Sequence, residues 1–386
     1  MVDLSRDQEK ALERLLAWQK NPQGDYLTLG GYAGTGKTTL IGVFRRGLHR
    51  EKPGLRVAFA SFTGRAARVL KQAVSQQQAL FGRDFVGTIH SLIYSPIISK
   101  KGEITGWDRR RKINFDLIVI DEASMVDEEI WQDLLSYQIP IIAVGDHGQL
   151  PPIRGHFNLM KKPDLKLESI HRQAQDNPII KVATIARQHG AIPALEFSPQ
   201  VLKIKKTSDE AAERVADWLA DYRPGMLILC GYNNTRVRLN AQIRKNLGFD
   251  SPSPQSGDRV ICLKNNHEVG IYNGMLGTID FIDRKNEDWY FAEISMDEEK
   301  DLYGGLIFTK QFNSKETLNP TDQRARFTKG DLFDFGYALT VHKAQGTQAK
   351  KVVLFEERFP QSSDDDWRRW LYTAVTRAEE ELYIIG

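Results

Sequence analysis

A short glycine-rich stretch near the N-terminus combines one lysine and three threonines with closely spaced glycines. The stretch GGYAGTGKTT spans residues 30–39 and contains the pattern G-x-x-x-x-G-K-T from Gly31 to Thr38. Glycines let backbone N–H groups approach phosphate oxygens that a Cβ atom would obstruct. In this pattern Lys37 supplies positive charge to the β- and γ-phosphates, and the Thr38 hydroxyl ligates Mg²⁺. The spacing therefore predicts a site for a nucleoside triphosphate.

The segments on either side also fit a phosphate-binding loop. DYLTLG before the loop is typical of a short apolar strand, and TTLIGVFRRGLHR after it has helical periodicity. A helix that begins at the loop directs the positive end of its dipole toward a bound anion. The alternative is a glycine-rich turn without a ligand, which the lysine and this context disfavour. The residues expected around the phosphates are Gly31, Gly34, Thr35, Gly36, Lys37, Thr38 and Thr39.

Polar side chains follow two further apolar runs. LIVIDEASM has Asp121 and Glu122 after one run, and IPIIAVGDHGQLPPI has Asp146 and Gln149 after the next. In an open parallel sheet, ligands lie beyond the carboxyl ends of the strands, so these side chains should face the loop. Asp121 then suits Mg²⁺, Glu122 suits the base for an attacking water, and Asp146 with Gln149 suits sensing of the γ-phosphate. For any single pair, a solvated strand end is the alternative.

Two arginines in the second half could complete this chemistry. They are Arg172 in LESIHRQ and Arg377 in YTAVTRAEEEL. Phosphoryl transfer spreads charge over the γ-oxygens, and an arginine inserted across a cleft can raise the rate by ~10³–10⁵. Taken alone, either arginine is more typical of a surface position. The expected catalytic set is Lys37, Glu122, Gln149, Arg172 and Arg377.

The composition limits the class of protein. The 386 residues suit two to three domains, and 41% hydrophobic with 27% charged content is ordinary for a globular chain. A net charge of +3 does not by itself indicate a nucleic-acid partner, although a local basic groove is compatible with it. Cys230 and Cys262 are the two cysteines, which excludes a disulfide framework and a cysteine-based zinc site. The apolar runs are too short for a membrane helix, and the N-terminus fits neither a signal nor a transit peptide, so we expect a cytoplasmic protein without a membrane partner.

The order of apolar runs predicts the architecture. Strand-like runs alternate with helical segments from about residue 26 to 165, and again from near Leu167. Such alternation is typical of parallel sheets covered by helices on both faces, so we expect an α/β fold with two such domains and a cleft between them. Between residues 256 and 330, short strands separated by Gly, Asn and Asp predict a small barrel inserted into the second half.

An ordered series of motifs resembles that of superfamily 1 DNA helicases, in the RecD-like and Dda-like branch called superfamily 1B. The series is LSRDQ, GYAGTGKTT, SFTGRAA, GTIHSL, IDEASM, GDHGQLPP, LESIHRQ, YALTVHKAQGTQ and YTAVTRA. The resemblance extends from Leu4 to the last strand. It implies two RecA-like domains that clamp ATP and Mg²⁺ between them and move along single-stranded DNA. It also implies a monomer that acts at junctions of single- and double-stranded DNA, and it leaves open contacts with single-strand-binding, replisome or repair proteins.

The resemblance assigns further nucleotide contacts by matching position. Gln8 resembles the glutamine that reads adenine, and Gln345 and Gly346 lie toward the nucleotide. Ser5 and Gln8 also form S-x-x-Q, the pattern of a helix capping box, and both readings can hold.

The resemblance also implies contacts with the DNA backbone. The implied residues are Phe62, Thr63, Arg65, Thr88 and His90 in the first domain, and Asn234, Thr340, His342 and Lys343 in the second. Contacts of this kind go to phosphate and sugar, so sequence preference should be weak. Phe62 stands where the family usually has proline. It either stacks on a base, worth ~1–3 kcal/mol, or packs beneath the strand, and its apolar neighbours favour packing.

The lengths of the insertions predict the direction of travel. The 3′→5′ branch carries large insertions in both halves, whereas a short segment separates Leu92 from Ile118 here. This architecture resembles the 5′→3′ branch, in which an inserted barrel lies over the DNA channel. The expected division is residues 1–91 and 115–165 for the first RecA-like domain, 92–114 for a β-hairpin insertion, 166–255 and 328–386 for the second RecA-like domain, and 256–327 for an SH3-like β-barrel.

The segment YSPIISKKGEITGWDRRRK, residues 94–112, interrupts the α/β alternation and should project as a hairpin. In the family, a projection here acts as a pin that splits the duplex. The apolar candidates for this role are Ile97, Ile98 and Trp107, and the phosphate-binding candidates are Arg109, Arg110 and Arg111. The alternative is a solvated hairpin whose charges aid solubility.

Two other classes of function compete with a helicase. One is a translocating subunit of a recombination or repair complex, and the other is a P-loop switch that binds nucleotide and signals. No appended domain is evident, which favours a self-contained enzyme. The paired arginines and Glu122 argue against a switch.

Overall fold

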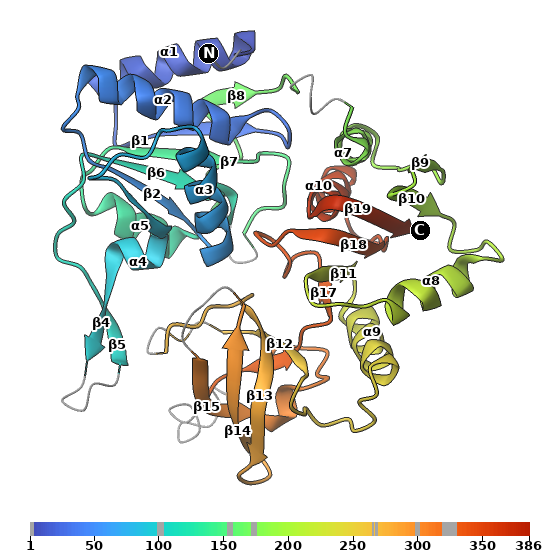
Figure 1. Ribbon diagram of the computed structural model, residues 1–386. Coiled ribbons are helices and arrows are strands. Elements are labelled where there is room, and N and C mark those ends of the chain that lie inside the picture. The colour runs from blue at the N-terminus through green and yellow to red at the C-terminus, as the bar shows by residue number, and fades with distance from the viewer. Residues whose placement is uncertain are drawn as a thin grey trace.

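The computed structural model describes residues 4–98, 104–152, 157–170, 176–264, 266, 269–297, 302–318 and 330–386. Figure 1 shows two parallel sheets side by side, a smaller antiparallel sheet below them, and a hairpin that projects from the first sheet's half. We call the residues up to β8 the first half and those from α7 onward the second half. In the described part of the chain, no helix is both long enough and apolar enough to cross a membrane.

The first sheet has six parallel strands in the order β3-β2-β6-β7-β1-β8. Its strands are β1 Tyr26–Gly31, β2 Val57–Ser61, β3 Phe85–Thr88, β6 Leu117–Asp121, β7 Ile141–Gly145 and β8 Leu165–Leu167. β8 pairs with β1, so Leu167 ends the first sheet, where the sequence suggested the start of the second α/β block.

Helices cover both faces of this sheet, as the alternating sequence predicts. They are α1 Arg6–Lys20, α2 Lys37–Glu51, α3 Gly64–Gln76, α4 Ile89–Ile93 and α5 Glu128–Leu135, with a 3₁₀ turn at Ala123–Met125. Successive strand residues belong to different cores, because side chains alternate across a strand. Val119 joins the core beneath α1 and α2, while Ile118 joins the core with Trp131 of α5. The apolar runs of β1, β2, β6 and β7 are therefore buried on both faces, whereas the edge strands β3 and β8 are less buried.

The second sheet has the order β17-β11-β18-β19-β10-β9 and is parallel except for β9. Its strands are β9 Glu196–Ser198, β10 Val201–Ile204, β11 Met226–Cys230, β17 Ala338–Thr340, β18 Ala349–Phe355 and β19 Ala378–Ile385. The accompanying helices are α7 Pro178–His189, α8 Ala211–Ala220, α9 Asn233–Asn246 and α10 Asp364–Val375. α7 packs against α10. These helices and strands form the second α/β layer that the sequence predicts.

The third sheet is antiparallel, with the order β15-β14-β13-β12-β16. Its strands are β12 Arg259–Cys262, β13 Leu276–Arg284, β14 Trp289–Met296, β15 Leu302–Phe308 and β16 Phe333–Phe335. A 3₁₀ turn at Thr309–Gln311 directly follows β15. The pairing of β16 with β12 carries this sheet beyond residue 327, the expected boundary. Its strands lie where short Gly-, Asn- and Asp-separated runs indicated all-β structure.

A two-stranded hairpin leaves the first half between α4 and β6. Its strands are β4 Tyr94–Ile98 and β5 Ile104–Arg109, paired antiparallel. The Tyr94 hydroxyl donates to Asp133 Oδ2 of α5 at 2.5 Å, which ties the base of the hairpin to the first half. The side chains of Ile97, Ile98 and Trp107 lie outside the described residues.

Candidate functional site

The glycine-rich loop joins the carboxyl end of β1 to the first turn of α2. Gly34 and Gly36 have φ angles of 78° and 72°, a region that residues with a Cβ atom rarely adopt. A Cβ atom at Gly31 would lie 2.6 Å from Thr35 Oγ1, so this glycine is needed for close packing. The loop thus has the backbone of an anion cradle at a helix N-terminus.

Lys37 closes the loop on itself. Its Nζ donates to Gly31 O at 2.7 Å and to Tyr32 O at 3.1 Å. These carbonyl groups hold the ammonium group inside the loop, where a phosphate would compete for it. The loop is therefore charged and preorganised for an anion.

Gln8 lies against the loop from the start of α1. It is fully buried, and its Nε2 donates to Thr35 O at 3.0 Å. Ser5 N donates to Gln8 Oε1 at 3.0 Å, and Gln8 N donates back to Ser5 Oγ. The predicted capping box is confirmed, and the same glutamine reaches the phosphate loop.

Asp121 and Glu122 follow the carboxyl end of β6, as predicted. Glu122 has φ 55°, a left-handed conformation that is unusual for a residue other than glycine. Such outliers concentrate at functional sites, where the surrounding structure maintains the strain. Burial raises the pKa of Asp121, Glu122 beside it raises it further, and the charge of Lys37 opposes both effects. A buried carboxylate with a raised pKa gains from a bound cation.

Asp146 and Gln149 lie in the loop after β7, and both are buried. Asp146 Oδ1 accepts from Gly148 N at 2.9 Å, and Gln149 Nε2 donates to Asp146 Oδ2 at 3.5 Å. Leu150 N donates to Thr373 Oγ1 of α10 at 2.9 Å, which joins this loop to the second half. The loop after β7 is thus fixed from both halves.

Tyr372 of α10 is a residue that the sequence reasoning missed. Its hydroxyl donates to Asp146 Oδ2 at 2.6 Å and accepts from Ala33 N of the phosphate loop at 2.6 Å. Burial and the charge of Asp146 raise its pKa well above the usual value, so the hydroxyl remains a donor. The available signal was its place in the motif YTAVTRA, but a tyrosine within a helix is ordinarily a core residue.

Arg187 of α7 is a second residue that the sequence reasoning missed. Its guanidinium carbon lies 3.7 Å from the centroid of the Tyr32 ring in the phosphate loop. Two aromatic rings also lie beside the Tyr32 ring, His147 with centroids 4.2 Å apart and Tyr372 at 6.0 Å. A cation over an aromatic face is worth ~0.5–2 kcal/mol, so α7 also holds the loop.

Arg377 follows α10 and is 1% exposed. Its Nε donates to Thr373 O at 3.0 Å. Burial lowers its pKa, and the charges of Glu122 and Asp146 act in the opposite direction, so the arginine lies within electrostatic reach of the first half. Arg172, the other arginine expected here, lies outside the described residues.

Gln345 and Gly346 also meet the first half. Gln345 Nε2 donates to Leu150 O at 2.8 Å. A Cβ atom at Gly346, where φ is 73°, would lie 2.5 Å from Met125 Sδ and 3.4 Å from Thr63 Cγ2. Both residues therefore lie at the junction of the two halves, and Gln345 contacts the loop that contains Gln149.

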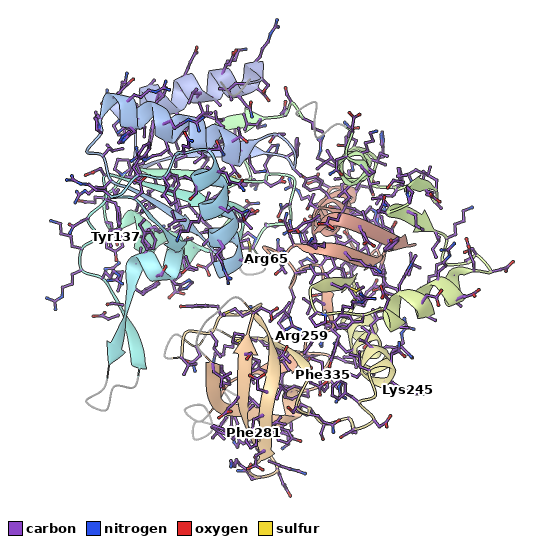
Figure 2. All side chains as sticks on the ribbon, in the orientation of Figure 1. Arg65, Tyr137, Lys245, Arg259, Phe281 and Phe335 are labelled. Carbon is purple, nitrogen blue, oxygen red and sulfur yellow. The ribbon has the colours of Figure 1, made fainter. Side chains whose placement is uncertain are left out.

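Thr63, Thr88 and Arg65, polar DNA-contact candidates of the first half, already have partners within the protein. Thr63 and Thr88 are the N-caps of α3 and α4, and their hydroxyls accept from Ala66 N and Ser91 N. Arg65 Nη2 lies 3.2 Å from Glu379 Oε1 of the second half, and this pair is partly exposed. Figure 2 labels Arg65 on the side of the first half that faces the second.

The aromatic candidates of the first half lie together, and His90 meets Tyr272, which lies between β12 and β13 of the third sheet. His90 is 3% exposed, and its ring centroid lies 4.4 Å from that of Tyr272 and 6.3 Å from that of Phe62. Phe62 is partly buried and packs against the core that contains Trp131. The packing interpretation of Phe62 is therefore consistent with its surroundings.

The candidates of the second half differ in exposure. Thr340 ends β17 and is 8% exposed, whereas Asn234 is exposed at the start of α9. His342 is partly buried, and that burial lowers its pKa, which favours the neutral imidazole. Lys343 lines a small cavity with Asn233.

Comparisons with known proteins match this arrangement. Residues 3–209 match the family described as AAA domain, and residues 335–385 match the UvrD-like helicase C-terminal domain. The chain is 27% identical to the ATP-dependent RecD2 DNA helicase of Deinococcus radiodurans over 99% of its own length and 49% of the relative. It is 26% identical to the RecBCD enzyme subunit RecD of Mycobacterium tuberculosis, over 98% of the chain and 69% of that protein.

A solved structure on DNA unwinding at forked double-stranded DNA by two coordinating Pif1 helicases shares the fold. The TM-score is 0.50 at 19% identity, with 100% of this chain and 92% of the other covered. The chain spans about half the length of the RecD2 relative. The family match covers more than half of the chain, and the motif series and relatives agree with it. The chain belongs to the AAA domain family, and its similarity to RecD2 and RecD agrees with the superfamily 1B motif series.

Proposed function

We propose that the chain is an ATP-dependent DNA helicase that moves 5′→3′ along single-stranded DNA and separates duplex strands. The observation that carries this proposal is the junction at α10. Tyr372 hydrogen-bonds to the phosphate loop and Asp146, and Arg377 lies within electrostatic reach of Glu122. A nucleotide in the loop would therefore be in contact with both halves, and its hydrolysis would change how the halves fit together.

The first half supplies the phosphate and metal groups in this proposal. Lys37 neutralises the β- and γ-phosphates, and Thr38 with Asp121 holds Mg²⁺, which supplies further positive charge there. The donor set fits this ion, because Asp121 is a partly buried carboxylate whose raised pKa a cation would lower again. Glu122 orients and deprotonates the attacking water.

The second half supplies the charge that completes the transition state. Arg377 and Arg172 stabilise the charge that develops on the γ-phosphate. Gln149 contacts the γ-phosphate and couples its presence to the neighbouring loop. Gln8 recognises the adenine base. Gln345 and Gly346 lie toward the nucleotide at the junction of the two halves, so they move when this junction closes. Gln345 is already bonded to Leu150 O, next to Gln149.

Single-stranded DNA crosses both halves in the proposed mechanism. It meets Phe62, Thr63, Arg65, Thr88 and His90 in the first half, and Asn234, Thr340, His342 and Lys343 in the second. The antiparallel sheet serves as an SH3-like barrel over this path, and the hairpin serves as the strand-separating pin. The proposed division is residues 1–91 and 115–165 for the first RecA-like domain, 92–114 for the hairpin insertion, 166–255 with 328–386 for the second RecA-like domain, and 256–327 for the barrel. Two elements depart from it, because β8 extends the first sheet to Leu167 and β16 belongs to the third sheet. The protein would act as a monomer in the cytoplasm.

A second candidate function is a translocating subunit of a recombination or repair complex. The observation that favours it is the similarity to a RecBCD enzyme subunit over 98% of the chain. In that case the same ATP site and DNA path would operate, but strand separation would depend on partner proteins.

ATPase activity with and without single-stranded DNA tests the proposal, followed by unwinding of a fork with a 5′ tail. Strong stimulation with unwinding is the expected result. Stimulation without unwinding would favour the subunit. An ATPase indifferent to DNA would overturn both motor functions and leave a nucleotide switch.

A further inference from the structure

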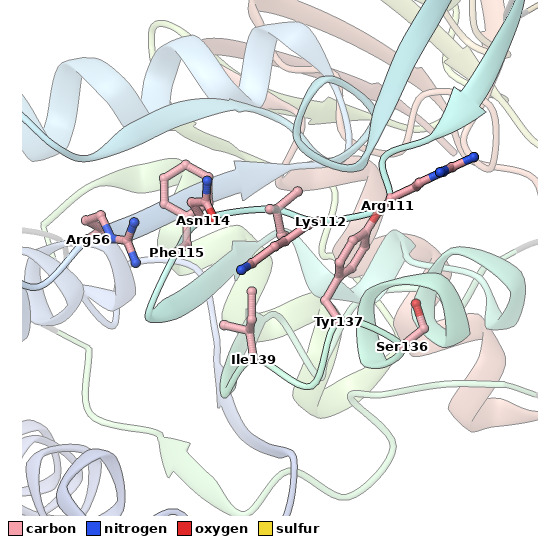
Figure 3. A pocket seen from close by; sticks show the side chains of 9 residues that line it. Arg56, Arg111, Lys112, Asn114, Phe115, Ser136, Tyr137 and Ile139 are labelled. Carbon is pink, nitrogen blue, oxygen red and sulfur yellow. The ribbon is translucent and has the colours of Figure 1, made fainter.

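A polar cavity lies at the amino ends of the strands of the first sheet, at the side opposite the phosphate loop. Its volume is about 320 Å³. Arg56 directly precedes β2, residues 111–115 lead into β6, and residues 136–139 lead toward β7, so the cavity lies at the amino ends of three parallel strands. Figure 3 shows Arg56, Lys112 and Arg111 in this order along its rim. The candidate ATP site follows the carboxyl ends, so a ligand here would not compete with nucleotide.

The cavity carries a surplus of positive charge. Arg56, Arg111 and Lys112 line it, and no carboxylate is among its lining residues. Arg56 is neutralised by Asp116, with Nη2 and Oδ1 3.0 Å apart. Within the described ranges, Arg111 and Lys112 are exposed and make no ion pair. Two full positive charges are therefore available to an anionic ligand.

The backbone under these cations is anchored. Arg110 N donates to Ile93 O at 2.8 Å, and the Tyr137 hydroxyl donates to Arg110 O at 2.7 Å. Arg109 is held by Asp133 at 3.1 Å, so this arginine is paired within the protein. Figure 2 labels Tyr137 beside the base of the hairpin. The backbone that leads into Arg111 and Lys112 is thus fixed next to β4 and β5.

The surroundings favour a polymer backbone over a small anion. Partly buried Phe115 and Ile139 form apolar walls, while exposed Asn114 adds a neutral hydrogen-bonding group. The Ser136 hydroxyl, which also lines the cavity, donates to Asp133 O at 2.6 Å. Such a mixture suits sugar and phosphate together. The single-strand candidates Thr63 and Thr88 lie at the carboxyl ends of β2 and β3, about 16 Å away along the five residues of β2.

We propose that this cavity binds backbone phosphates of duplex DNA and holds the duplex beside the hairpin. The inference rests on the proposed helicase function and adds a duplex site to it. Arg111 and Lys112 each contact a phosphate, and Asn114 binds sugar or phosphate oxygens. Arg56 lines the cavity from within its ion pair with Asp116.

Binding measured against salt concentration tests the site without ATP. Log K falls as log salt rises, and each phosphate contact contributes about −0.9 to this slope for duplex DNA. We expect Arg111→Gln/Lys112→Gln to make the slope for a blunt duplex less negative by about 2. The slope for a single-stranded oligonucleotide should not change. Fluorescence anisotropy with both DNAs across a salt series measures the two slopes.

The matched control is Lys205→Gln/Lys206→Gln. These adjacent exposed lysines follow β10 in the second half, and their removal changes net charge equally. The control should leave both slopes unchanged. An unaltered duplex slope in the Arg111→Gln/Lys112→Gln protein overturns the proposal, as does an equal loss for single-stranded DNA. Failure of the helicase proposal is recognised separately, as ATPase activity of the unaltered protein that DNA does not stimulate.

Discussion

The Tyr372 hydroxyl donates to Asp146 Oδ2 at 2.6 Å and accepts from Ala33 N at 2.6 Å. One side chain of α10 thereby joins the loop after β7 to the phosphate loop. The bond to Asp146 is charge-assisted and buried, and such bonds are worth about 1.5–3 kcal/mol. The two halves are therefore tied together at the point where nucleotide would bind.

Tyr372→Phe should lower the free energy of unfolding by about 1.5–3 kcal/mol, because Asp146 loses a buried donor. A double-mutant cycle with Asp146→Asn, followed by chemical denaturation, measures the coupling. Tyr383→Phe is the control, since the Tyr383 hydroxyl donates to Glu381 at 2.8 Å in a more exposed setting. A coupling energy near zero would mean that the contact does not stabilise the junction.

Lys37→Ala and Glu122→Gln should both abolish DNA-stimulated turnover, for different physical reasons. The first change removes phosphate charge and should weaken ATP binding. The second keeps the shape of the side chain and removes the base, so ATP should still bind. Turnover assays paired with nucleotide-binding titrations separate the two. Near-normal turnover of the Glu122→Gln protein would show that another group is the base.

Arg377→Ala should reduce kcat by about 10³ or more while the KM for ATP changes little, because its charge acts on the transition state. Arg172→Ala should behave in the same way. Arg377 is 1% exposed, so Arg377→Lys, which retains the charge without the planar fork, is a useful companion. Steady-state kinetics with a thermal unfolding check distinguishes lost chemistry from lost folding. An effect on KM alone would put the arginine outside the catalytic cleft.

Unwinding should proceed from a 5′ single-stranded tail and poorly from a 3′ tail. The short insertion between Leu92 and Ile118 and the motif forms are the basis of this prediction. Strand-displacement assays with matched duplexes that differ only in the tail give the answer. Efficient unwinding from a 3′ tail, with none from a 5′ tail, contradicts the predicted polarity.

Replacement of residues 95–107 by a Gly/Ser linker should leave DNA-stimulated ATPase activity and translocation largely intact while unwinding collapses. The reason is that the hairpin projects from the first half and contributes no residue to the candidate ATP site (Figure 1). Unwinding that survives, or ATPase activity that falls in parallel with unwinding, would exclude a pin.

The phosphate loop and the capping box could be predicted from the sequence because their interactions are local. Residues within one turn or loop determine the left-handed conformation of Gly34 and Gly36, as well as the strand before them and the helix after them. Gln8 bonds to Ser5 three residues away. The places of Asp121 and Glu122 could also be predicted, because an apolar run marks the strand that they end. In open parallel sheets, ligands bind beyond the carboxyl ends of the strands.

Contacts between distant segments were decided by the tertiary structure alone. Tyr372 and Ala33 are 339 positions apart, and nothing near either residue indicates the partner. Arg187 meets Tyr32 because α7 packs on α10, which in turn packs on the loop after β7. β8 joins the first sheet through the pair Leu29↔Leu165, whose residues are 136 positions apart. β16 joins the third sheet through the pair Ile261↔Asp334, whose residues are 73 positions apart. Hydrogen bonds and packing across such separations depend on how whole elements dock, and the local residue pattern carries no record of that docking.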